Sequence, residues 1–281
     1  MAGKSPSSED LGVRMKENYE YRTRYFLPRR TYTLIRVDGR SFHAYTRGCA
    51  RPFDLGLMED MDSTAIALCA AIEGAVMAFV QSDEISLLLT DFASRQTEAW
   101  FDGSVQKICS LSASIATGAF NLARQLRREE IEPKANTTGE NPLPRHFYSL
   151  AQFDSRVWTI PDPSEVYNYF VWRQQDATRN SISMAAQAQF SHAELQGVSG
   201  NPMQELLWTH KGINWNDYPA GCKRGRMILR QEKLADVSFI DRRTGEEQTV
   251  ENVVRHSWQV VDPPDFTGAS EWLKTRIPSY S

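Results

Sequence analysis

Cysteine is scarce in this sequence and follows no metal-binding or disulfide pattern. The 281 residues contain no C-x-x-C pair and no cysteine at zinc-like spacing from a histidine. The four cysteines are Cys49, Cys69, Cys109 and Cys222. No signal peptide is recognisable, and apolar runs such as 75–80 are far too short to cross a bilayer. We therefore expect reduced thiols in a cytoplasmic protein without a membrane segment.

A surplus of positive charge is also missing. The chain carries 32 Lys and Arg against 35 Asp and Glu, which leaves a net charge of -3. No global basic field attracts nucleic acid, so an RNA partner would have to bind a local basic patch. No internal repeat is visible either. With 41% apolar residues, the chain can bury one large core or two modest ones.

Alternating strand and helix patterns predict an α+β fold. β-Branched and aromatic runs indicate strands, and apolar residues at helical spacing indicate helices between them. The predicted order is a strand at 31–37, a helix at 57–72, strands at 75–80 and 85–89, a helix at 105–126 and a strand at 156–160. This β-α-β-β-α-β order is that of the ferredoxin-like split unit. We predict a ferredoxin-like palm domain with a C-terminal α/β extension.

The remaining segments divide the chain into three parts. Residues 1–16 are predicted to be a disordered leader, 17–135 the palm catalytic domain, and 136–281 a C-terminal part that completes the sheet. Within these parts we expect a helical approach at 19–30, a surface loop or linker at 129–145, and separate helices at 166–175 and 180–189.

Three carboxylates are expected at one end of the sheet. Asp38 ends the first strand, and Asp83 with Glu84 lies in the predicted hairpin turn. The first strand and the hairpin are central neighbours in a β-α-β-β-α-β sheet, so these side chains can converge. Carboxylates held so close repel one another unless a cation joins them. Two Mg²⁺ ions would relieve the repulsion and form a clamp for nucleotidyl transfer. On spacing alone, an ordinary turn and a solvated hairpin tip remain an alternative.

The residues around Asp38 and Asp83 suit a triphosphate. Gly39 permits a close backbone approach, and the residues after it offer N–H groups, an arginine and a histidine. Ser82 could donate its hydroxyl to phosphate or merely support the turn. Asp-Gly-Arg is also a common turn, and a lone His43 is more often an ordinary surface or core histidine.

Two longer motifs make a family recognisable. Residues 36–43 (RVDGRSFH) and 81–86 (QSDEIS) resemble the R-x-D-G-R-x-F-H and Q-S-D-E-x-S motifs of the tRNA-His guanylyltransferase family. Further matches follow in order between about Tyr19 and Arg230. They are Lys107 with Ala113-Ser114, the F-D-x-R sequence at 153–156, the W-R-Q-x-D sequence at 172–176, and Arg224-Gly225 with Ile228-Leu229.

One stretch departs from the eukaryotic pattern. There W-R-Q-x-D is followed by H-I-N-N-L-Y-N, whereas residues 178–184 here read TRNSISM. Only one asparagine is kept at a matching position and the histidine is absent. This is similar to the bacterial and archaeal tRNA-His guanylyltransferase-like branch. That resemblance implies template-dependent 3′-5′ addition of nucleotides to 5′-truncated tRNA, a repair activity. The altered motif puts a strict tRNA-His preference and the ATP-activation step in doubt.

The resemblance also implies a site. Asp38, Asp83 and Glu84 are the expected catalytic residues, and two Mg²⁺ ions would bind Asp38, Asp83 and the carbonyl of Gly39. GTP or another NTP, and ATP, are the expected substrates. The expected nucleotide contacts are Asp38, Gly39, Arg40, Ser41, Phe42, His43, Ser82, Asp83, Lys107 and Arg224. Lys107 could equally be an ordinary solvated helix lysine.

The implied partner is tRNA, bound by a homotetramer without membrane contact. Candidate RNA-binding clusters are Arg29 and Arg30, Arg124, Arg127 and Arg128, and Lys223, Arg224, Arg226 and Arg230, although such clusters are more often solvated faces. The aromatic stretch 167–172 could stack bases or form a half-buried helix. Two rivals remain: a palm-type nucleotidyl cyclase, whose G-G-D-E-F hairpin is missing here, and a non-catalytic tRNA-binding relative.

Overall fold

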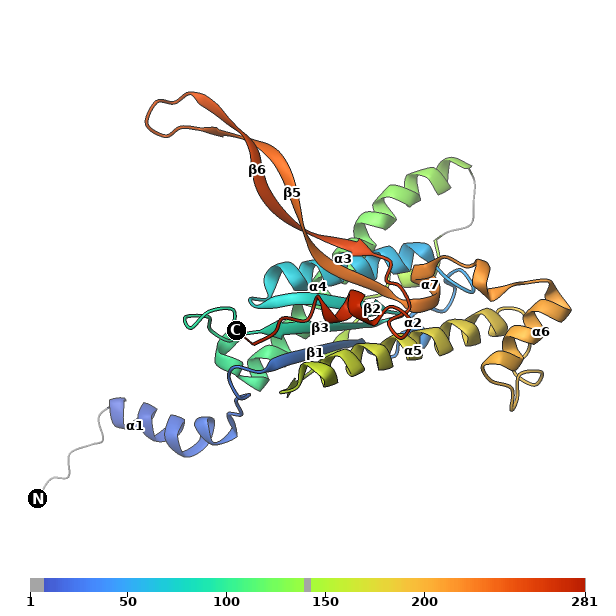
Figure 1. Cartoon of the computed structure of the whole chain (residues 1–281), viewed down its shortest axis with the longest axis horizontal. Coiled ribbons are helices and arrows are strands. Elements are labelled where there is room, and N and C mark those ends of the chain that lie inside the picture. The colour runs from blue at the N-terminus through green and yellow to red at the C-terminus, as the bar shows by residue number, and fades with distance from the viewer. Residues whose placement is uncertain (1–7, 139–142, 281) are drawn as a thin grey trace, which may run out of the picture.

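Six antiparallel strands form a single sheet in the order β4-β1-β3-β2-β5-β6 (Figure 1). The computed structural model describes residues 8–138 and 143–280. The strands are β1 (Tyr32–Gly39), β2 (Ala75–Gln81), β3 (Glu84–Thr90), β4 (Phe153–Ile160), β5 (Arg226–Ile240) and β6 (Glu247–Val261). β1 to β4 with their two crossover helices have the predicted β-α-β-β-α-β order, and the C-terminal part adds β5 and β6 to the edge at β2.

Helices cover both faces of this sheet. α3 (Leu55–Ala71) and α4 (Val105–Thr138) pack on one face and α5 (Pro163–Gln187) on the other. α1 (Ser8–Met15) and α6 (Asn201–Lys211) lie away from the sheet (Figure 1). The short helices and turns are η1 (Lys16–Glu20), η2 (Tyr21–Thr23), α2 (Phe42–Tyr45), η3 (Trp100–Gly103), η4 (Arg145–Phe147), η5 (Trp215–Asp217), α7 (Ala220–Arg224) and α8 (Ser270–Lys274). Among the described residues, no helix is long and apolar enough to span a membrane.

Two hydrophobic cores explain why the strands are apolar on both faces. In β1, Ile35 and Val37 pack in one core with residues of α3 and α4. Tyr32 and Leu34 point to the opposite face, into a second core with α5 and the C-terminal segment around Phe266. Side chains alternate along a strand, so a sheet covered on both faces gives continuous apolar runs. The runs in β2 and β3 have the same cause.

Several segments differ from the sequence-based predictions. The predicted leader 1–16 is helical from Ser8 to Met15, and residues 1–7 lie outside the described part. The expected helix at 19–30 ends at Thr23, and the expected loop at 129–145 is helical as far as Thr138. The two helices expected at 166–175 and 180–189 form one helix, α5. Without Gly or Pro after its first turn, nothing in the sequence breaks α5.

β5 and β6 extend far beyond the body of the protein. From Arg230 onward they pair only with each other and project as a long two-stranded ribbon (Figure 1). Large apolar side chains on the ribbon are exposed, among them Leu234, Ile240 and Val254. The part of β5 next to β2, Met227 to Leu229, is buried in the sheet.

Candidate active site

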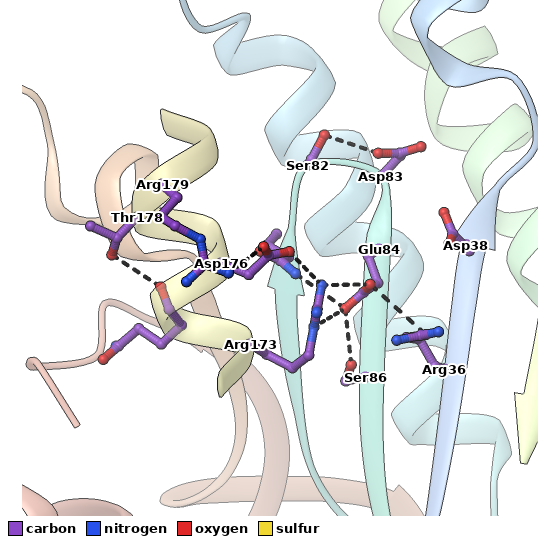
Figure 2. A network of polar contacts seen from close by, with 12 residues as sticks. Arg36, Asp38, Ser82, Asp83, Glu84, Ser86, Arg173, Asp176, Thr178 and Arg179 are labelled. Atoms are coloured by element: carbon purple, nitrogen blue, oxygen red, sulfur yellow. Dashed lines mark hydrogen bonds and ion pairs between the residues drawn. The ribbon is translucent and has the colours of Figure 1, made fainter. Parts of the chain in front are cut away.

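Asp38 and Asp83 lie at the same end of the two central strands. Asp38, near the end of β1, is in register with Glu84 of β3 and with Asp154 of β4. Asp83 occupies the two-residue turn between β2 and β3, where its carbonyl accepts the N–H of Gly39 at 3.1 Å. Figure 2 shows the Asp83 and Asp38 carboxylates beside each other at this end of the sheet. The predicted convergence of the carboxylates is therefore present.

Gly39 is required for packing at this point. A Cβ atom there would lie 2.2 Å from the ring of Phe42. That ring is buried in the α3–α4 core, with centroids 5.5 Å from Phe120 and 5.3 Å from Phe153. The loop after β1 is thus anchored to the core by Phe42. Phe42 was expected to contact the nucleotide, but only its backbone can do so, because its side chain is buried.

Burial makes Asp83 an unusual carboxylate. Desolvation raises its pKa to about 6, and the nearby charges of Asp38 and Glu84 act in the same direction. The Ser82 hydroxyl, which donates to Oδ1 of Asp83 at 2.9 Å, opposes this rise in pKa. Negative charge held in a poorly solvated place is stabilised by a cation. The environment of Asp83 therefore favours a bound metal ion.

The donor atoms at this end fit Mg²⁺. Carboxylate and carbonyl oxygens are the hard ligands that Mg²⁺ prefers, and Mg²⁺ usually takes one or two carboxylates and completes its shell with water and phosphate. Within residues 8–138 and 143–280, no group of three or more His, Cys, Asp or Glu side chains could hold a metal. A Mg²⁺ site with only two carboxylates needs no such group. Asp38, Asp83 and the Gly39 carbonyl could supply its protein ligands, with phosphate and water filling the other positions.

Glu84 is occupied by a different partner. Nε and Nη2 of Arg173 donate to its two carboxylate oxygens, each at 2.8 Å, and Ser86 donates at 3.3 Å. Arg36 lies 3.9 Å away on the other side. Figure 2 shows Glu84 turned toward Arg173 of α5. Since a bidentate arginine neutralises this carboxylate, Glu84 positions β3 and Arg173 and is not available as a third metal ligand.

Arg173 and Arg156 are the site residues for which the sequence argument gave no role. Arg173 belongs to the W-R-Q-x-D motif. Its partner, Glu84, is brought to it by the packing of α5 over β3, which the motif alone does not indicate. Arg156 of β4 lies 3.9 Å from Asp38 and 3.4 Å from Asp154, and its side chain is 53% exposed. It is a cation at the open edge of the site.

A hollow opens beside the Ser82–Asp83 turn. Its enclosed volume is about 80 Å³, smaller than a typical closed ligand pocket. Ser82 and Gln81 line it next to the carboxylates, and a second hollow that shares Ser82 continues toward Thr46. The rest of the lining is mostly apolar and comes from α3, α5 and α7 and from residues next to α3 and α7: Phe53, Asp54, Leu57, Met58, Ala177, Asn180, Ser181, Met184, Gly221, Cys222, Gly225 and Arg226.

The other expected nucleotide contacts are placed differently. Arg40 is exposed and donates to the Gln152 side chain at 2.9 Å, and Ser41 and His43 are exposed on the same loop. Lys107 does not reach the site. Thr117 of α4 contacts Phe153, the register partner of Gly39, and Lys107 lies ten residues earlier, roughly 15 Å along the helix. The ammonium of Lys107 instead lies 5.6 Å from the Phe101 ring centroid.

Arg224 lines a separate hollow. Its neighbours there are Gln174, Thr178 and Arg179 of α5, together with Trp215. Arg224 does not line the hollow beside Ser82.

Most arginines in the candidate RNA-binding clusters are structural. Arg29 binds Asp91 at 2.7 Å, and Arg30 donates to two backbone carbonyls. Arg124 and Arg226 are buried beside Asp60 and Asp62. Lys223 is buried and donates to the Asn216 carbonyl, and Arg127 binds Glu59 and Asp60. These residues fix the fold, because their charges already have partners.

Without divalent metal, Asp83→Asn is expected to stabilise the protein at pH 7.5. The folded-state pKa of Asp83, about 6, lies above the unfolded value of 3.8. The folded state therefore favours the protonated form of Asp83. The stability of the folded state is highest below pH 3.8, and this advantage is lost as the pH rises through 6 and the buried carboxylate ionises. After allowance for partial exposure, the variant gains on the order of 1–2 kcal/mol at pH 7.5 and about half as much at pH 5. Urea denaturation in EDTA at both pH values measures this, and a variant no more stable than wild type at pH 7.5 would contradict it.

A palm-type sheet with two carboxylates at one end of its central strands can hold the metal ions that nucleotidyl transfer uses. Comparison with known proteins agrees with the nucleotidyltransferase class. Residues 13–161, more than half of the chain, match the model of the tRNAHis guanylyltransferase family. The chain belongs to that family, and the fold of its members is the palm-type fold observed here.

Individual relatives support the assignment. The tRNA(His) guanylyltransferase of Saccharomyces cerevisiae is 26% identical over 222 residues, which cover 74% of this chain and 86% of the yeast protein. A bacterial tRNA(His) guanylyltransferase-like protein solved with ATP is 39% identical, with a TM-score of 0.76 over 95% of this chain and 99% of the other. A structure solved with GTP is 36% identical, with a TM-score of 0.72 over 96% and 99%.

Proposed function

We propose that this protein adds nucleotides to the 5′ end of tRNA by template-dependent 3′-5′ transfer. The observation that carries the proposal is the pair Asp38 and Asp83 at one end of the sheet, beside a mostly apolar hollow. Glu84 is neutralised by Arg173, so the negative charge that remains for metal ions is concentrated on this pair. The ATP and GTP complexes of the bacterial relatives support nucleotide binding in this fold.

The expected reaction joins the 3′-hydroxyl of an incoming nucleotide to the 5′-phosphate of the RNA. A 5′-monophosphate end is first adenylylated with release of pyrophosphate, and AMP then leaves as the new bond forms. A 5′-triphosphate end needs no activation and releases pyrophosphate. When bound, two Mg²⁺ ions would acidify the attacking hydroxyl and stabilise the leaving oxygen.

The protein's own residues have simpler tasks in this proposal. Asp38, Asp83 and the Gly39 carbonyl hold the metal ions, and the exposed loop from Arg40 to His43 with the Ser82 hydroxyl contacts the triphosphate. The apolar hollow takes the nucleoside and excludes water around it. Because the metals activate the hydroxyl, the reaction needs no protein general base.

The altered stretch 178–184 supports repair rather than strict tRNA-His guanylylation. Asn180, Ser181 and Met184 from this stretch line the hollow beside Ser82. Ser181 and Met184, which depart from the eukaryotic motif, would contact a nucleoside bound there, beside the retained Asn180. We propose that this lining accepts whichever nucleotide the template specifies, including GTP. The protein would act on truncated tRNA in the cytoplasm. We also propose that it is a homotetramer, and light scattering of the purified protein tests this oligomeric state.

The substrate range is testable with two tRNA transcripts that lack their first nucleotide, tRNA-His and one other. With labelled NTPs and Mg²⁺, the wild-type protein is expected to extend both and to add the nucleotide complementary to the opposing template base. Extension of tRNA-His alone would support guanylylation and overturn the repair role. A cyclic product from GTP and Mg²⁺ without RNA would instead identify a nucleotidyl cyclase. Binding without extension would indicate a non-catalytic relative.

A further inference from the structure

Trp172 presents a large aromatic ring close to the candidate active site. Its side chain lies in the first half of α5, and the residue is 47% exposed. The guanidinium carbon of Arg173 lies 4.4 Å from the Trp172 ring centroid. Tyr169 meets the same ring edge-on, with centroids 5.9 Å apart and an interplanar angle of 65°. The ring therefore presents an aromatic surface to solvent beside two groups that contact it.

The contacts of Arg173 hold this ring in place. Arg173 binds both oxygens of Glu84 at 2.8 Å and also Asp176 at 2.9 Å, so its guanidinium has a fixed position. Tyr169 is fixed as well, because its hydroxyl lies 2.7 Å from that of Ser86 on β3. One side of the Trp172 ring is therefore supported by rigid groups and the remainder is open to solvent. A ring held in this way loses little entropy when a ligand stacks on it.

Exposed arginines also lie along this flank of α5, each beside a carboxylate: Arg179 binds Asp176 at 2.9 Å, and Arg156 lies 3.4 Å from Asp154. Residues 169, 172, 176 and 179 recur at helical spacing, so they share one side of α5. This side faces β4, since Tyr169 packs against Trp158 at 5.6 Å. Arg179 at the end of the row is 60% exposed, and Arg156 on β4 is 53% exposed. An aromatic ring flanked by exposed arginines is the combination that single-stranded nucleic acids bind, by base stacking and phosphate contacts.

This flank is distinct from the hollow proposed for the incoming nucleotide. The hollow is lined by Ala177, Asn180, Ser181 and Met184 from the second half of α5, and Trp172 does not line it. Trp172 nonetheless lies near the carboxylates. Its ring contacts Arg173, and Arg173 binds Glu84, which is in register with Asp38. The hollow and the Trp172 ring are thus two separate features along α5.

We propose that Trp172 is a stacking platform for the terminal nucleobase of the RNA 5′ end, with Arg156 and Arg179 contacting the adjacent phosphates. This inference rests on the proposed function and adds a subsite to it. A nucleobase can also come from a nucleoside triphosphate. The two arginines favour a polynucleotide, because both are exposed at the surface, Arg156 on β4 and Arg179 at the hollow that Arg224 also lines.

Kinetics of three variants test the proposal. Trp172→Leu keeps an apolar side chain against Arg173 but cannot stack, and is expected to raise KM for a 5′-triphosphorylated RNA about tenfold. KM for the NTP and the Mg²⁺ dependence should stay unchanged. Trp172→Phe should restore most of the RNA affinity. Trp208→Ala, which removes another exposed tryptophan on α6, should behave as wild type. An increase in KM for the NTP instead would assign the ring to the incoming nucleotide and overturn the proposal.

A binding measurement without turnover separates stacking from other effects. RNA with 2-aminopurine as its first base is titrated with protein in EDTA. Wild type and Trp172→Phe should quench the fluorescence, and Trp172→Leu should not. Equal quenching by Trp172→Leu, or equal KM for RNA, overturns the stacking role while wild-type extension still stands. Absence of wild-type extension would instead refute the proposed function, and the quenching would then report RNA binding alone.

Discussion

Asp83→Ala is expected to lower the rate of 5′-end extension by at least about a thousandfold, since metal ions supply several kcal/mol of transition-state stabilisation. Asp83 provides one of only two carboxylates for the metals. Alanine removes that ligand and also the charge that makes the site attractive to a cation. The measurement is a single-turnover assay with saturating NTP, Mg²⁺ and a 5′-triphosphorylated RNA, so that the activation step does not limit the rate.

Asp154 offers a matched control for this experiment. It is an exposed carboxylate, in register with Asp38 on the neighbouring strand, and its nearest described cation is Arg156 at 3.4 Å. Asp154→Ala is expected to change the rate by less than about threefold, because an exposed ion pair contributes little. If Asp154→Ala were as inactive as Asp83→Ala, the ligand set would have to include Asp154. If Asp83→Ala extended RNA at the wild-type rate, the metal assignment would be wrong.

The sequence predicted the central sheet well because its signals are local. The run before Asp38 and the two runs around Ser82-Asp83 are short, apolar and bounded by turn residues, so their strands and register follow directly. The convergence of Asp38 and Asp83 follows from the order of the elements alone. No local pattern, however, indicates which helix side chain contacts which strand side chain. The sequence therefore identified Arg173 only as part of a motif, because its bond to Glu84 depends on tertiary packing.

The errors in the sequence-based predictions have the same origin. Lys107 is on the expected helix, but its distance from the strand end depends on how far along α4 the contact with Phe153 occurs. Phe42 stands in a loop motif and is nevertheless buried, because Gly39 lets its ring reach the core. The ribbon of β5 and β6 was not predicted, since most of its residues are exposed on both faces and show no apolar alternation.

Arginine clusters were the least informative pattern, and Arg124 shows why. It stands in a run with Arg127 and Arg128 that resembles a basic RNA-binding face. In the structure only 2% of Arg124 is exposed, with its Nε 3.1 Å from a carboxylate oxygen of Asp60, which is 1% exposed. Arg127 donates to the other oxygen of Asp60 at 2.9 Å. A charge count cannot distinguish such a buried group from a solvated face.

Asp60→Asn is expected to destabilise the protein by about 3–5 kcal/mol, since it leaves the buried charge of Arg124 without a counter-ion. Glu59→Gln is the control. Glu59 binds the same Arg127 at 2.8 Å, but its side chain is 65% exposed, so its loss should cost less than about 1 kcal/mol. Urea denaturation of both variants at pH 7.5 measures the difference. Equal destabilisation by the two variants would show that the burial of Asp60 does not determine how much the protein is destabilised.

A double variant separates the value of the ion pair from the cost of breaking it. Burial raises the pKa of Asp60 even though Arg124 and Arg127 act to lower it. Desolvation thus outweighs the attraction, and the pair itself adds little net stability. Asp60→Asn combined with Arg124→Met removes both charges and should recover most of the loss, to within about 1–2 kcal/mol of wild type. A double variant as unstable as Asp60→Asn alone would mean that Asp60 acts mainly through Arg127.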